Sequence, residues 1–134
     1  MPFPYFGLVN IAKFTYLIPN SQALLRLFPH EKKVVIALDN EFCFEQEEHL
    51  LRFCENADIL IWDGMYTDGE IENKKGWGHS TIEQAVYFAE KSDVKKTVIC
   101  HHSPTRSDAE IDAIKASLSG RNVEFGIEGT KFSL

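Results

Sequence analysis

The sequence predicts an α/β domain built on a largely parallel β-sheet. Three continuous apolar runs, at residues 34–38, 59–62 and 97–100, are typical of strands that are buried on both faces. Segments of helical length separate these runs, and strands that alternate with helices form βαβ units. A length of 134 residues fits one domain, so we expect a single domain over residues 1–134.

The first 28 residues are rich in aromatic side chains and precede the alternating pattern. Residues 14–18 predict a strand that ends at Pro19-Asn20, and residues 23–28 predict a returning strand that ends at Pro29. We interpret the aromatic side chains of this segment as part of a core or an interface, because they form no recognisable ligand-binding motif.

Helix signals lie between the buried runs. A polar stretch over about residues 45–55 predicts the first helix, with apolar side chains on one side. Residues 80–83 (Ser-Thr-Ile-Glu) have the form of a capping box and predict the start of a second helix. Residues 107–110 form another capping box, and the helix after it is expected to end near Gly120.

The remaining segments are predicted as loops and short strands. A loop rich in glycine and charged residues is expected between Asp63 and His79. Short closing strands are expected at residues 123–125 and 131–134. We interpret Lys74-Lys75 as part of a solvated surface.

Composition narrows the possible functions. A formal net charge of −6 argues against a large nucleic-acid footprint, which would need clustered Lys and Arg. Three cysteines are an odd number without metal-motif spacing, and two are expected to be buried free thiols. We find no secretory signal and no apolar run long enough to span a membrane, so the sequence predicts a cytoplasmic protein.

Four polar side chains are predicted to meet at one edge of the sheet. Asp39, Asp63 and His101 each follow one of the buried strands, and His79 directly precedes a helix start. Ligands of such sheets bind beyond the carboxyl ends of the strands. Two carboxylates and two imidazoles in that position predict a metal site or an acid–base site.

Several motifs resemble those of one family. Residues 38–41 (LDNE) are similar to a "TD-T/N-E" segment, and residues 57–63 (ADILIWD) resemble an "AD-L-L-I-H-D/E" strand. Residues 76–81 match "GWGHST", and residues 101–104 (HHSP) resemble "HH-D-P". Together these motifs resemble the metallo-β-lactamase-fold hydrolases, in the ribonuclease Z-like and cyclic-nucleotide phosphodiesterase-like branches.

The resemblance implies a role for each of the four side chains. It implies that Asp39 bridges two metal ions, usually zinc with manganese as the alternative, and that His101 is a metal ligand. It implies that Asp63 pairs with His79 and that this pair handles protons at a phosphate. The substrate would then be a small phosphate-containing molecule.

The same resemblance implies a truncated or degenerate hydrolase. The family's fold is an αββα sandwich, of which this chain would form half: a mixed sheet with helices on one face. The family's "HxHxDH" signature is absent, and Ile18 stands before Pro19 where the family has a ligand His. A catalytic zinc needs about three protein ligands, so we expect weak or no activity from the chain alone. In the alternative, another chain or an upstream segment supplies the missing ligands.

Simpler interpretations stay open for each candidate residue. Asp39 could be a turn residue, and His101 with His102 could be structural histidines. Asp63 and His79 could form a surface salt bridge. Because half a sandwich leaves one apolar sheet face without its partner layer, we also expect a homodimer or a higher homo-oligomer.

Overall fold

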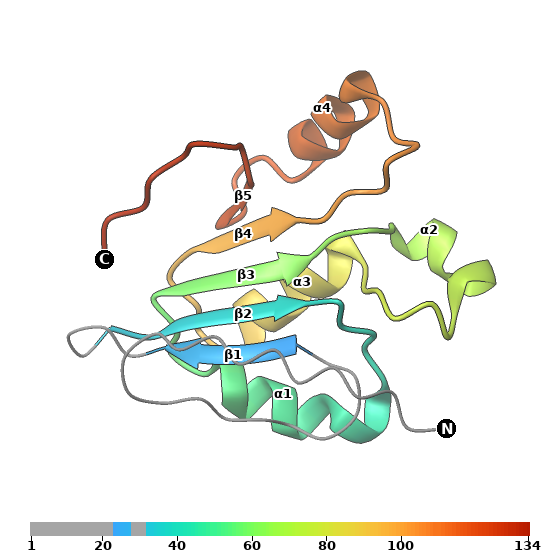
Figure 1. Cartoon of the computed structure of the whole chain (residues 1–134). Helices are drawn as coiled ribbons and strands as arrows, with labels where there is room; N and C mark the ends of the chain where they lie inside the picture. The colour runs from blue at the N-terminus through green and yellow to red at the C-terminus, as the bar shows by residue number, and fades with distance from the viewer. Residues whose placement is uncertain (1–22, 28–31) are drawn as a thin grey trace.

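Five strands form one mixed sheet in the order β1-β2-β3-β4-β5 (Figure 1). The strands are β1 (Ala23–Leu27), β2 (Val34–Leu38), β3 (Ile59–Asp63), β4 (Thr97–Cys100) and β5 (Val123–Phe125). β1 runs antiparallel to β2, and the other neighbouring pairs are parallel. This computed structural model describes the backbone of residues 23–27 and all of residues 32–134. The predicted strand at residues 14–18 lies outside the described residues.

The helices connect the parallel strands, and the three longest of them cover one face of the sheet, while the short helices after β3 lie beyond the strand ends (Figure 1). The helices are η2 (Phe44–Gln46), α1 (Glu47–Cys54), α2 (Asp68–Ile71), η3 (Glu72–Lys74), α3 (Ile82–Lys91) and α4 (Asp108–Ser117). Because sequential parallel strands are joined by right-handed crossovers, α1, α3 and α4 lie on the same face. The predicted mixed sheet with helices on one face is confirmed. None of the helices in the described part of the chain is long and apolar enough to cross a membrane.

The core lies between this helix layer and the sheet. Trp62 of β3 is fully buried and stacks on Phe88 of α3, with ring centroids 5.0 Å apart. The indole N–H of Trp62 donates to the Thr81 carbonyl at 3.1 Å, which ties the middle of the sheet to the start of α3. The central strand and the helix that follows it are therefore fixed to each other by both packing and a buried hydrogen bond.

The opposite face of the sheet is less buried. Ile36, Ile61 and Val98 are paired across β2, β3 and β4, so their side chains share this face. Ile36 and Ile61 are only half-buried, whereas Ala37 and Trp62 on the helix face are fully buried. Within the described residues, the helix layer thus covers one side of an otherwise apolar sheet.

Three helices start at capping boxes, two of them near the predicted positions. Ser107 caps α4 as predicted, because its hydroxyl accepts from the backbone N–H of Glu110. The predicted cap of α3 is wrong by one residue: Thr81 is the N-cap, and it pairs with Gln84. Ser80 is unavailable for capping because it is fully buried and its hydroxyl donates to the Asn40 carbonyl.

Three further predictions need correction. Residues 131–134 form no strand, because they have no pairing partner among the described residues. The segment between Asp63 and His79 contains α2 and η3 rather than loop alone. Of the three cysteines, Cys54 is buried while Cys43 and Cys100 are half-buried, and all three are free.

Candidate metal and acid–base centre

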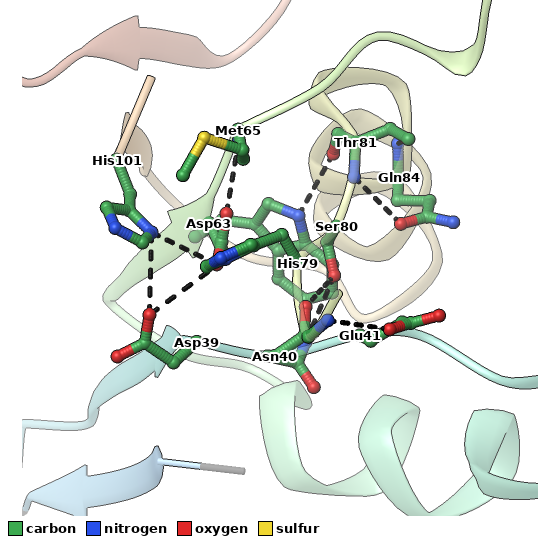
Figure 2. A network of polar contacts seen from close by, with 12 residues as sticks. Asp39, Asn40, Glu41, Asp63, Met65, His79, Ser80, Thr81, Gln84 and His101 are labelled. Atoms are coloured by element: carbon green, nitrogen blue, oxygen red, sulfur yellow. Dashed lines mark hydrogen bonds and ion pairs between the residues drawn. The ribbon is translucent and has the colours of Figure 1, made fainter. Parts of the chain in front are cut away.

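Four side chains converge at the carboxyl ends of the parallel strands (Figure 2). Asp39 follows β2, Asp63 ends β3, His101 follows β4, and His79 lies three residues before α3. One ligand atom from each residue can be chosen so that all four lie within 4.8 Å of one another. The predicted convergence is confirmed, while the separate roles of the four residues stay predictions.

Asp63 is the buried centre of the cluster. Its side chain has no exposed surface, and its Oδ2 atom lies 2.8 Å from His79 Nδ1 and 3.3 Å from His101 Nδ1. Its Oδ1 atom accepts a hydrogen bond of 3.1 Å from the backbone N–H of Met65. A buried carboxylate needs such partners, so Asp63 holds both imidazoles in place and is itself held by the backbone.

Asp39 closes the cluster from the solvent side. Its side chain is 67% exposed, and its Oδ1 atom lies 3.6 Å from His101 Nδ1 and 3.9 Å from His79 Nδ1. Both Asp39 and His101 have positive φ angles, of 46° and 60°. Left-handed backbone is uncommon outside glycine and tends to gather at functional positions. The strand ends are therefore bent so that both side chains turn toward one point.

The donor set fits a divalent metal ion. Tetrahedral zinc with bonds of about 2.0–2.2 Å places its ligand atoms roughly 3.3–3.6 Å apart. The carboxylate-to-imidazole separations in the cluster run from 2.8 to 3.9 Å and bracket that value. Burial, and after it the nearby Asp63, Glu70 and Glu41 carboxylates, raise the pKa of the Tyr66 hydroxyl beside the cluster. Imidazole with carboxylate suits zinc and manganese alike.

Glu41 holds the backbone next to the cluster, a role that its place in the sequence did not indicate. Its carboxylate accepts hydrogen bonds from the backbone N–H groups of Gly76 at 2.6 Å and Gly78 at 2.7 Å. Asn40 next to it contacts Ser80, so residues 40–41 are joined to the segment that carries His79 (Figure 2). The LDNE motif contained Glu41, but no spacing rule indicated that its partner would be backbone.

His102 does not join the cluster. Its ring stacks on Phe125, with centroids 4.9 Å apart, on the helix side of the sheet. Burial and the neighbouring Arg106 cation lower the pKa of His102. Successive residues at a strand end point to opposite sides, which leaves His101 as the histidine of this pair in the cluster.

Sequence comparison relates the chain to ribonuclease Z. It is 36% identical over 63 residues to ribonuclease Z of Exiguobacterium sibiricum, covering 47% of this chain and 21% of that protein. It is 35% identical over 78 residues to ribonuclease Z of Pyrococcus horikoshii, covering 58% and 24%. The chain therefore spans about a quarter or less of the length of these relatives. No protein-family profile matches the chain.

Structure comparison gives the fold. The metallo-β-lactamase fold protein YhfI from Bacillus subtilis superposes with a TM-score of 0.63 and 17% identity, over 80% of this chain and 42% of that one. This chain has part of the metallo-β-lactamase fold, and over part of its length it is similar in sequence to ribonuclease Z. One sheet with one helix layer agrees with the predicted half of a sandwich, and the partial coverage is consistent with a truncated or degenerate form.

Proposed function

We propose that the chain carries part of a metal-dependent phosphodiesterase centre, which binds one divalent ion and hydrolyses weakly or not at all on its own. The convergence of Asp39, Asp63, His79 and His101 is the observation that carries this proposal. Asp39 and His101 are the proposed metal ligands, with zinc or manganese as the ion. A bound ion would supply Lewis-acid chemistry and lower the pKa of a water molecule.

Asp63 and His79 form the proposed proton-handling pair. The Asp63 carboxylate accepts from the Nδ1–H of His79, which fixes the tautomer and leaves Nε2 for the leaving oxygen. His79 keeps a 19% exposed side chain, so a substrate can reach it, while Asp63 is closed to solvent. To act as the general acid, His79 must carry a second proton on Nε2 that it gives to the leaving oxygen, and the Asp63 carboxylate orients the ring from Nδ1.

We infer that the substrate of the complete centre is an RNA phosphodiester rather than a small phosphate compound. The relatives that support this inference are named for ribonuclease activity. The net charge of −6 limits the contact to a short stretch of the strand, since a wide footprint would need clustered cations. We also propose that the protein is located in the cytoplasm.

The isolated chain is expected to bind Zn²⁺ or Mn²⁺ yet show no more than marginal hydrolysis of bis(p-nitrophenyl) phosphate. Two proposed ligands fall short of the roughly three that a catalytic zinc uses. The metal content after dialysis tests metal binding, and the release of nitrophenolate tests hydrolysis. If the isolated chain hydrolyses this substrate, and if both EDTA and His79→Ala abolish that hydrolysis, the expectation of weak or no activity is wrong. Such hydrolysis would favour the alternative, in which another chain completes the centre.

We also propose that the half-buried sheet face pairs with a second copy of the chain. Ile36 and Ile61 are half-buried on that face, although Val98 beside them is buried, and closed two-fold dimers are the commonest assembly of identical chains. Light scattering after gel filtration should give twice the 15.3 kDa chain mass. Ile61→Lys should restore the monomer, whereas Ile127→Lys, at a 66% exposed position, should not. A wild-type monomer at micromolar concentration would contradict the dimer.

A further inference from the structure

Trp77 is a large apolar side chain that the fold leaves in solvent beside the centre. It is 61% exposed, whereas the other tryptophan, Trp62, is fully buried. A tryptophan normally buries most of its surface, so an exposed one needs an explanation. Trp77 lies two residues before His79, and two residues span at most about 7 Å of chain. An RNA strand with a phosphate at His79 can therefore come within reach of this indole.

The backbone that carries Trp77 is fixed. Gly76 and Gly78 have φ angles of 83° and 86°, and a Cβ atom at either position would meet nothing within 4 Å. Both glycines are thus required for their left-handed backbone, not for lack of space. Their N–H groups donate to the Glu41 carboxylate, and the N–H of Trp77 donates to the Lys74 carbonyl at 3.1 Å. The backbone that carries the indole is therefore held in place before any ligand binds, which lowers the ordering cost of binding.

A cation accompanies the indole. The Lys74 ammonium lies 4.1 Å from the ring centroid of Trp77, in a cation–π contact. Lys75 is next in the chain and pairs with Glu72 at 2.8 Å. Among the described residues, no carboxylate pairs with Lys74, so its charge is available to a phosphate. The segment between α2 and α3 lies beyond the carboxyl ends of β2 and β3 (Figure 1), on the same side as the centre.

We propose that Trp77 and Lys74 form a nucleotide subsite, in which a base of single-stranded RNA stacks on the indole and an adjacent phosphate contacts the ammonium. Exposed aromatic rings beside cations bind single strands in this way, because every base offers a π-face. The subsite rests on the proposed function, since it names the part of the RNA that lies next to the phosphate in the centre. Stacking does not involve the metal ion, so the two ideas can fail separately.

The test measures binding of labelled octaadenylate RNA to the full chain by fluorescence anisotropy, at low salt and with EDTA. An abasic ribose-phosphate oligomer of the same length is the second probe, because it keeps the phosphates and removes the bases. Trp77→Ala is expected to weaken octaadenylate binding about 5- to 150-fold, the range for loss of one base–aromatic stack. Affinity for the abasic oligomer is expected to stay within about twofold, because that oligomer makes only phosphate contacts.

Two more variants complete the test. Trp77→Phe keeps an aromatic face and is expected to retain most of the octaadenylate affinity. Tyr87→Ala removes a 38% exposed aromatic ring from α3 and is expected to leave binding unchanged. Equal affinity of wild type and Trp77→Ala for octaadenylate would overturn the subsite. An equal loss of affinity for both oligomers in Trp77→Ala would also overturn it. The same holds if the wild-type chain does not bind octaadenylate. If base-dependent binding is present but metal binding is absent, the subsite stands and the proposed centre fails.

Discussion

Replacing Asp39 or His101 with asparagine is expected to weaken Zn²⁺ and Co²⁺ binding by more than about 100-fold. Loss of an outer-shell partner alone typically costs 10- to 100-fold in metal affinity, and a direct ligand should cost more. Asparagine suits this test because both positions have positive φ, which asparagine tolerates better than alanine. Titration with Co²⁺, followed by its visible absorption, measures the affinity, and competition with Zn²⁺ extends the range.

Asp93→Asn is the matched control for the metal-binding test. Asp93 is an exposed aspartate with a φ of 51° that lies outside the cluster, so its replacement changes charge and backbone preference in the same way. Asp63→Asn separates two roles: a loss within 10- to 100-fold indicates an outer partner of His101, and a larger loss indicates a direct ligand. If Asp39→Asn and His101→Asn both bind metal as tightly as Asp93→Asn, the proposed ligands are wrong.

The candidate metal cluster was predictable because its assembly depends on topology. Asp39, Asp63 and His101 each follow a buried apolar run, and parallel strands bring their carboxyl ends to one edge. Such runs identify strands from the chain alone, since both faces must be apolar. The family resemblance added roles for the residues, but their positions in space needed only strand order.

Details set by tertiary contacts were not predictable. Ser80 and Thr81 are both good capping residues, and the choice of Thr81 depends on Asn40, which takes the hydroxyl of Ser80. α2 was missed because Gly69 lies inside it and it is only four residues long, although Thr67 and Glu70 form a capping box that could have indicated it. Residues 131–134 failed as a strand because no neighbouring edge pairs with them.

Replacing Trp62 with alanine is expected to lower the free energy of unfolding by about 3–5 kcal/mol, the usual cost of emptying a core tryptophan site. The side chain is fully buried and stacks on Phe88, so its removal leaves a cavity between the sheet and α3. It also leaves the buried Thr81 carbonyl without its indole donor. Urea denaturation followed by far-ultraviolet circular dichroism measures the change, which is a large share of the 5–15 kcal/mol typical of a domain.

Trp77→Ala is the matched control for this loss, because it removes the same side chain from a 61% exposed position. Its cost should stay below about 1 kcal/mol, the value of an exposed cation–π contact. Trp62→Phe should fall between the two, since it keeps an aromatic ring near Phe88 but removes the donor to Thr81. If Trp62→Ala and Trp77→Ala destabilise equally, then β3 and α3 are not joined through the Trp62 indole. The position of His79 beside Asp63 would then depend on the Glu41 and Asn40 contacts instead.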